Sequence, residues 1–193
     1  CTFRNNSAAR GGGMYNILAS GPALISCTFE GNSATNYEGG GMFNTSSSPT
    51  LFDCRFMGNS SVAGGGMYNE SSNPDLSACT FTDNSAIVRG GGMYNDSSSS
   101  TLTSCTFTSN STAGSDTQGG GVYNGYCAPS FNDCRFIDNF APFGSGMYNT
   151  VALPSLLRCV FRRTLRPSRP ELCITTPVRT AFSTPVSSPT IPR

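Results

Sequence analysis

Short segments in which apolar and polar residues alternate recur along this chain at a nearly fixed period. Each repeat reads Leu-x-x-Cys-x-Phe-x-x-Asn, then a variable gap, Gly-Gly-Gly-Met-Tyr-Asn and a Ser-rich link back to Leu. The alternation and the β-branched content predict strands, and no useful length shows the 3.6-residue period of a helix. The repeated cysteine recurs every 25 to 29 residues, at Cys1, Cys27, Cys54, Cys79, Cys105, Cys134 and Cys159.

A period of this length indicates stacked supersecondary units, none of which can bury its apolar face alone. We therefore expect an all-β fold, a right-handed parallel β-helix of about six rungs over residues 1–161, with two or three short strands per rung. The spacing within Leu-x-x-Cys-x-Phe-x-x-Asn is constant, whereas the gap from Asn to the Gly triplet varies. Insertions are thus confined to one corner, because a strand cannot gain a residue without flipping its side chains.

Each repeated position predicts a column of stacked side chains. The Leu, Cys and Phe columns should lie inside, and the Asn after Phe should sit at a bend, where its amide bonds the next rung. The glycines should supply positive φ or a close backbone approach at a corner. In Met-Tyr-Asn we expect Met inside and Tyr outside, because the Tyr hydroxyl is better left in water.

A family resemblance follows from these motifs. Phe-x-x-Asn followed by Gly-Gly and a small aliphatic residue resembles the repeat of the chlamydial polymorphic outer membrane proteins and related bacterial β-helix surface proteins. The match runs from Phe3 to Asn149; it departs at Gly13 and Ser145, where the family usually has Ala, and in its use of Met. The resemblance implies a secreted or surface-displayed structural or adhesive segment, extracellular or at the bacterial outer membrane.

Composition excludes several other classes. Charged residues make up 12% of the chain, all twelve basic residues are Arg, and His, Lys and Trp are absent. The repeats carry no basic stripe, so we expect no nucleic-acid partner. No apolar run approaches the roughly 20 residues of a membrane helix. The chain opens on Cys1 within a motif, which predicts an internal fragment whose uncapped sheet ends favour self-association.

The nine cysteines suggest disulfides or zinc at first sight. Seven of them share the column beside Phe, none forms Cys-x-x-Cys, and free Cys is among the most buried residue types. We interpret the column as buried thiols, because parallel in-register side chains point the same way and bridge poorly. Cys127 lies off the column and is the better candidate for a bridge or a free surface thiol. We expect no metal and no cofactor.

Pectin lyases and polygalacturonases also use β-helices, so an enzyme is the natural alternative. Asp53 and Asp133 share an outward column but lie three rungs apart, roughly 14 Å, too far for a glycosidase pair. Arg55 and Arg135 are scattered, and adjacent rungs do not reinforce them. We therefore predict no catalytic residues and no enzyme activity. The alternative function is the non-catalytic portion of a pectin lyase-like carbohydrate-active enzyme.

Two surfaces are candidates for binding. The first would be a ladder of Thr-x-Thr pairs, which is typical of ice-binding solenoids, but the pairs occupy only two consecutive rungs, at residues 80–82 and 106–108. Arg, Glu and Met interrupt the rest, so this face does not support ice binding. An aromatic stripe is the better candidate, because an outward strip would suit stacking on glycans or docking a host or cell-surface protein. Its structural alternative is ring stacking that holds rungs in register. It comprises Tyr15, Phe43, Tyr68, Tyr94, Tyr123 and Tyr148.

Sequons for N-glycosylation are also frequent. Most of their asparagines belong to ladder columns whose amides should be engaged, so we interpret them as incidental. They begin at Asn5, Asn44, Asn59, Asn69, Asn95 and Asn110.

Residues 162–193 lose the pattern and are rich in Pro and Arg, which is typical of a disordered tail. A sharper hypothesis is that the coding sequence here is read one base out of frame. Each codon of the other frame then consists of the last base of one codon and the first two bases of the next. Residues 164–166 can then read Asn-Ser-Ala, and residues 171–175 can read Gly-Ala-Met-Tyr-Asn. Residues 183–193 can likewise restore Leu-x-x-Cys-x-Phe-x-x-Asn-Ser-Ala, with its Cys at 186. We predict a frameshift near Arg162 and Arg163, with repeats continuing in the other frame.

Overall fold

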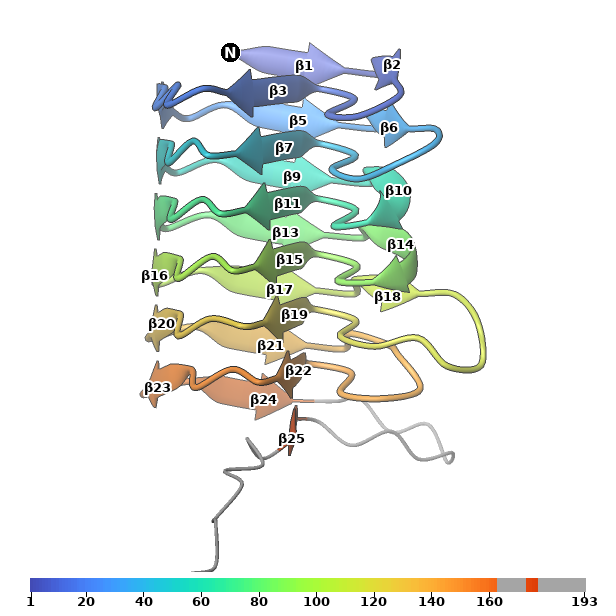
Figure 1. Cartoon of the computed structure of the whole chain (residues 1–193), viewed down its shortest axis with the longest axis vertical. Coiled ribbons are helices and arrows are strands. Elements are labelled where there is room, and N and C mark those ends of the chain that lie inside the picture. The colour runs from blue at the N-terminus through green and yellow to red at the C-terminus, as the bar shows by residue number, and fades with distance from the viewer. Residues whose placement is uncertain (163–172, 177–193) are drawn as a thin grey trace, which may run out of the picture.

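The computed structural model describes residues 1–162 and 173–176, and every regular element within them is a β-strand. The chain winds as a parallel β-helix of about six turns whose rungs stack along one axis (Figure 1). The predicted all-β parallel β-helix is therefore confirmed. Equivalent positions of successive rungs stand opposite one another; Phe81, for example, pairs with Phe56 and Phe107. The boundary at residue 161 stays a prediction.

Four parallel sheets, here called A to D in the order in which each rung crosses them, run the length of the β-helix. Sheet A contains β1 (Thr2–Arg4), β5 (Thr28–Glu30), β9 (Arg55–Met57), β13 (Thr80–Thr82), β17 (Thr106–Thr108), β21 (Arg135–Ile137) and β24 (Val160–Arg162). Sheet B contains β2 (Ser7–Ala8), β6 (Ser33–Ala34), β10 (Ser60–Ala63), β14 (Ser85–Arg89) and β18 (Ser111–Thr112). Sheet C contains β3 (Met14–Ile17), β7 (Met42–Thr45), β11 (Met67–Glu70), β15 (Met93–Asp96), β19 (Val122–Gly125), β22 (Met147–Thr150) and β25 (Cys173–Thr176). Sheet D contains β4 (Ala23–Ile25), β8 (Thr50–Phe52), β12 (Asp75–Ser77), β16 (Thr101–Thr103), β20 (Ser130–Asn132) and β23 (Ser155–Leu157).

A rung therefore has up to four strands, and the expectation of two or three is wrong. The additional strands are those of sheet B, which use the Asn-Ser-Ala segment that turn chemistry alone assigns to a bend. Ser33 pairs with Ser7 on one side and Ser60 on the other, so these short strands are held by neighbouring rungs. A single rung in isolation carries no such signal.

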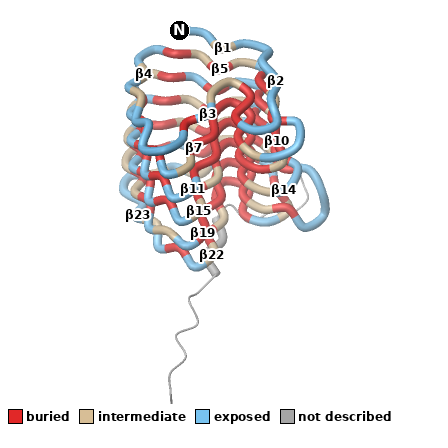
Figure 2. Tube along the Cα trace, turned by 45° about the horizontal axis from the view of Figure 1, so that its top comes forward, coloured by how far each residue is buried: buried red, intermediate tan, exposed pale blue. Residues whose placement is uncertain are grey.

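The interior is one continuous apolar column. Figure 2 shows buried residues recurring at the same places in successive rungs. Successive Phe rings stack with centroids 4.5 to 5.1 Å apart. Leu and Cys join them, as expected, and so does the Met of Met-Tyr-Asn, which is fully buried. The placement of Met inside is thus confirmed. The buried Met column comprises Met42, Met67, Met93 and Met147.

The corners of the rung are made by left-handed residues, most of them not glycine. Between sheets D and A, Ala78 has φ 53°, and between A and B, Asp83 has φ 54°. Between C and D, Val151 has φ 50°, although left-handed φ is a genuine outlier for a β-branched residue. Only the corner between B and C always uses glycine, the first of each triplet. The chain therefore accepts repeated backbone strain to turn sharply within about 26 residues.

The second and third triplet glycines are required by contact with the next rung. A Cβ on Gly12 would lie 2.5 Å from the Ser33 carbonyl oxygen, because the chain packs back directly onto sheet B. A Cβ on Gly92 would lie 2.6 Å from the Gly121 carbonyl oxygen and 2.9 Å from the Phe107 ring. The expectation of positive φ or close approach is confirmed for both kinds of position.

These contacts predict a strong position dependence for glycine substitution. We expect Gly92→Ala to lower the free energy of unfolding by about 3 kcal/mol, the upper end of overpacking costs, because its Cβ meets backbone on the next rung. Gly58→Asp is the matched control, since nothing lies within 4 Å of its Cβ and Asp83 occupies the equivalent site. Urea denaturation measures both. Equal unfolding midpoints for the two variants would contradict the assigned contact.

Candidate functional surface

The aromatic stripe forms a ladder on sheet C. Its rings stack with centroids 4.6 to 5.6 Å apart and interplanar angles of at most 18°. The Tyr side chains lie outside the apolar interior, on the opposite face of the strands from Met. Sheet C thus separates an inner Met column from an outer aromatic column.

Most of this outer column is nevertheless covered. Tyr15, at the first rung, is 42% exposed, but Phe43 is 2%, Tyr68 8% and Tyr123 5% exposed. Tyr94 and Tyr148 are half-buried. The expectation that the stripe stands in water is therefore wrong for most of its length, which favours ring stacking that holds the rungs in register.

The cover comes from the chain just before the Gly triplets. The Arg10 guanidinium lies 4.6 Å from the Tyr37 ring centroid and 5.6 Å from that of Phe43, and it pairs with Glu38 at 3.2 Å. Three rungs further on, Arg89 lies 5.2 Å from the Tyr123 ring centroid and donates to Gln118 at 3.0 Å. Cations placed over ring faces are attracted by the ring quadrupole. These contacts therefore hold the two arginine side chains over the aromatic ladder and cover its rings.

Burial also makes the ladder poorly suited to proton transfer. Desolvation, reinforced by the neighbouring Tyr123, raises the pKa of Tyr94 to about 12. Desolvation likewise raises the pKa of Tyr68. Both hydroxyls are therefore neutral at physiological pH, which removes them as general bases.

Two further columns are buried asparagine ladders. After Phe, each amide nitrogen donates to the next asparagine and to a Phe carbonyl one rung back; Asn59 Nδ2 contacts Asn84 Oδ1 and Phe29 O, both at 2.9 Å. In Met-Tyr-Asn, Asn69 Nδ2 donates to Asn95 Oδ1 at 2.8 Å. The predicted amide ladder at the bend is confirmed. The engaged sequon asparagines are Asn44, Asn59, Asn69, Asn95 and Asn110, all 0% exposed.

Between its two ends the cysteine column is buried, as expected, whereas Cys1 is exposed and Cys159 partly buried; all seven thiols are free. The Cys79 sulfur donates to the carbonyl oxygens of Ser77 at 3.4 Å and Leu51 at 3.7 Å. A hydrogen bond with the neighbouring Cys79 thiol, together with burial, raises the pKa of Cys54. The column therefore behaves as packed, weakly bonded apolar residues. Off the column, Cys127 is a free, partly buried thiol.

Cys127 gives a measurable pH dependence. Burial raises its pKa to about 11, against roughly 8.5 for an ordinary thiol. Because only the thiolate reacts, we expect its alkylation rate to keep rising about tenfold per pH unit up to pH 10. A small-molecule thiol of ordinary pKa, the control, should level off above pH 9. Site-resolved mass spectrometry follows the labelling; a Cys127 plateau near pH 9 would contradict the burial effect.

The charged residues weighed for catalysis do not converge. Asp133 accepts two hydrogen bonds from Arg158, at 2.6 and 2.8 Å, and this contact lowers the pKa of Asp133. Asp53 lies three rungs away from Asp133 and accepts a hydrogen bond from Ser26 at 3.0 Å. Arg55 begins β9 with its side chain exposed, and Arg135 occupies the equivalent place in β21. The structure brings none of the four into one site.

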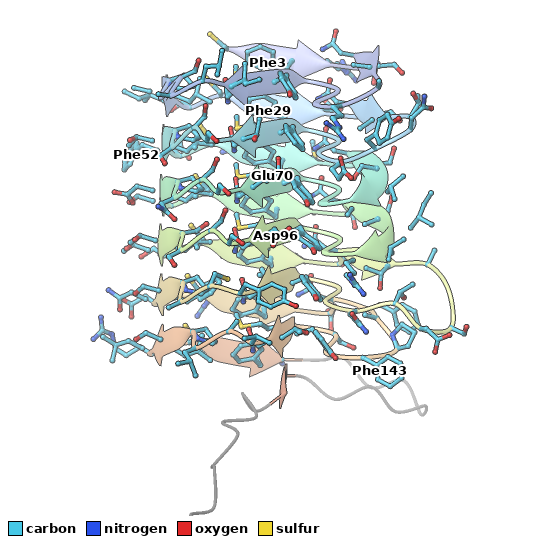
Figure 3. The ribbon with its side chains drawn as sticks, in the orientation of Figure 1. Phe3, Phe29, Phe52, Glu70, Asp96 and Phe143 are labelled. Atoms are coloured by element: carbon cyan, nitrogen blue, oxygen red, sulfur yellow. The ribbon has the colours of Figure 1, made fainter. Side chains whose placement is uncertain are left out.

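A closer carboxylate pair was missed by the sequence analysis. Glu70 and Asp96 end β11 and β15 and are direct partners in the register of sheet C (Figure 3). Each lies two residues beyond a ladder tyrosine and therefore points to the same outer face. Glu70 is exposed and Asp96 half-buried. The sequence carries the signal, because both residues directly follow Met-Tyr-Asn in adjacent repeats.

An open hollow of about 350 Å³ lies over sheet B. Its walls are small hydroxyl and methyl side chains, with Ser33, Ser60 and Ser85 stacked in register and Ile87 beside them. Among the described residues, no three His, Cys, Asp or Glu side chains form a group that could hold a metal ion. The described chain also contains no helix long and apolar enough to cross a membrane.

The fold and this surface define a parallel β-helix, and the comparisons agree. The family model described as the right handed beta helix region matches residues 61–153. No curated protein and no solved structure matches the chain.

Proposed function

We propose that this chain is a non-catalytic structural and adhesive segment of a secreted or surface-displayed β-helix protein, as the resemblance to polymorphic outer membrane proteins implies. The observation that carries the proposal is that the corner of variable length is also the place where exposed apolar side chains gather. The scaffold columns of Phe and Asn repeat without change, and the Met column changes only at Val122; away from the end rungs all of them are buried. The corner between sheets B and C, in contrast, varies in length and protrudes (Figure 2). A rigid rod that presents variable loops suits binding better than chemistry.

The variable corner also carries exposed large apolar residues. Isolated apolar residues on a surface need no explanation, but several at one corner favour contact with a partner. Glycans or cell-surface proteins are the partners that such aromatic and aliphatic groups suit. The exposed residues at this corner are Tyr37 at 47%, Phe140 at 54% and Phe143 at 43%, and Ile87 at 60% and Val88 at 40% adjoin it in β14 of sheet B.

The proposal is tested by displaying the chain on beads and measuring binding to a glycan array and to cultured cells. We expect Phe140→Ser with Phe143→Ser to reduce binding at least tenfold. The matched control is Ile25→Ser with Phe52→Ser, which changes two exposed apolar residues on sheet D. Absence of binding by the unaltered chain, or an equal loss in the control, would remove the adhesive function.

The Glu70 and Asp96 pair favours a second candidate, a carbohydrate-active β-helix enzyme. Their strands are neighbours, so the carboxylates stand roughly one strand spacing of 4.8 Å apart, close to the 5–5.5 Å of retaining glycosidases. Release of new reducing ends from plant or microbial polysaccharides, abolished by Glu70→Gln and by Asp96→Asn, would establish this function. Unchanged polysaccharide would leave the non-catalytic proposal in place.

A further inference from the structure

The six sequons of this chain are sorted by the fold into two kinds. Five have an asparagine with 0% exposure, and one, Asn5, is exposed. The buried five belong to the two asparagine ladders, in which neighbouring rungs bond to the same amide. The enzyme that transfers glycans to sequons acts on chains during their synthesis. At that stage the chain is unfolded, so all six asparagines are accessible to it.

The chemistry of transfer conflicts with the ladder bonds. A lipid-pyrophosphate-linked oligosaccharide donates its glycan, so that a bond forms between asparagine Nδ2 and the sugar C1, one amide proton leaves, and the lipid pyrophosphate departs. One N–H then remains on Nδ2. Asn59 needs two, because Nδ2 donates to Phe29 O at 2.9 Å and to Asn84 Oδ1 at 2.9 Å. Asn110 has the same pair of bonds, to Phe81 O and Asn139 Oδ1.

The glycan itself also has no room. The sheet C asparagines lie between successive rungs, and Asn69 is bonded on both sides, by Asn44 at 2.8 Å and to Asn95 at 2.8 Å. A saccharide on Nδ2 would have to enter an interior in which successive strands are about 4.8 Å apart. The rungs on either side would separate, and both ladders would end there.

Asn5 is different because of its place at a corner. It is the left-handed residue between sheets A and B, with φ 54°, and its side chain is exposed. Four of the five equivalent corner residues of later rungs, Gly31, Gly58, Asp83 and Ser109, are exposed even though rungs lie on both sides of them, and the fifth, Asp138, is half-buried. Exposure at this corner is thus a property of the fold.

We infer that N-glycosylation and folding exclude one another at Asn44, Asn59, Asn69, Asn95 and Asn110, and that Asn5 is the one sequon asparagine the folded chain can carry modified. The chain accordingly matures where folding is not preceded by asparagine glycosylation. This inference is independent of the adhesive role, because it rests only on burial and on ladder bonds.

The experiment is cell-free translation of the full chain, with an added signal sequence, into glycosylating microsomes that contain a thiol reductant. Glycan occupancy is read by mass spectrometry, and folding by resistance to protease after detergent lysis. The comparison variant removes the five buried sequons with Ser46→Gly, Ser61→Ala, Ser71→Gly, Ser97→Gly and Thr112→Ala. Its matched control, Ser7→Ala, removes only the Asn5 sequon. The changes suit their sites, because the glycines replace left-handed residues and Ala86 occupies the column of Ser61.

We expect the protease-resistant fraction of the unaltered chain to carry glycan only at Asn5, and chains modified at the other five to be degraded. The five-sequon variant should give at least a fivefold larger resistant fraction, and Ser7→Ala should give no increase. A resistant chain with glycan at Asn59 or Asn95 would overturn the inference. The inference would also be overturned if none of the five buried sequons received a glycan in the microsomes. It would be overturned as well if the five-sequon variant folded without microsomes but gave no larger protease-resistant fraction within them.

Discussion

Replacing Asn84 by Leu should lower the free energy of unfolding by about 4 kcal/mol or more, because four hydrogen bonds vanish from a site with no access to water. Asn84 Nδ2 donates to Phe56 O and to Asn110 Oδ1, both at 2.9 Å. Its Oδ1 accepts from the Asn59 backbone nitrogen at 3.0 Å and from Asn59 Nδ2 at 2.9 Å. The buried partners left behind each carry an unmet desolvation penalty of about 1–3 kcal/mol.

The matched control is Asn73→Ala. Asn73 is exposed, and its side-chain oxygen accepts a hydrogen bond from the Ser99 backbone nitrogen at 2.7 Å. Removing it should change stability by about 1 kcal/mol or less, because water replaces the lost partner. Urea denaturation followed by circular dichroism compares the two. Equal urea unfolding midpoints for Asn84→Leu and Asn73→Ala would show that the asparagine ladder does not contribute to stability.

How far the sequence predicts this molecule depends on whether a feature repeats. The columns of Phe, Cys and Asn were predictable because each recurs at a constant distance from its neighbours, and stacking forces equal positions together. Gly92 was predictable as a close approach for the same reason. Periodicity therefore carried the fold, the interior and the corner that tolerates insertions.

Features set by non-repeating residues were not predictable. The cover over the aromatic ladder depends on Arg10, Tyr37 and Arg89, which lie in the variable gap and have no counterpart in every rung. No spacing rule shows that these side chains fold back over sheet C. The exposed residues of the same gap, such as Phe143, were missed as a candidate surface for that reason (Figure 3).

The chain beyond Arg162 contains one described strand that bears on the predicted frameshift. Most of it, including residues 164–166 and 183–193, lies outside the described residues. Strand β25 is described, however, and it pairs with β22 so that Cys173 stands opposite Met147, Ile174 opposite Tyr148 and Thr175 opposite Asn149. These are the three positions at which the shifted reading frame can encode Met, Tyr and Asn. The shifted codons and the backbone pairing are independent of each other, and both make residues 173–175 the equivalents of Met-Tyr-Asn, which supports a frameshift.

The nucleotide sequence should therefore encode Gly-Ala-Met-Tyr-Asn at positions 171–175 in the shifted frame. A chain made from that frame should gain a further rung and unfold at higher urea concentration than a chain ended at Arg162. The gain in free energy should be about 2 kcal/mol or more, because the rung would cover Leu156, now 41% exposed, and half-buried Phe161. The control is the chain as written, whose residues after Arg162 should add little to the truncated chain. Different codons at 171–175, or a restored chain no more stable than the truncated one, would end the hypothesis.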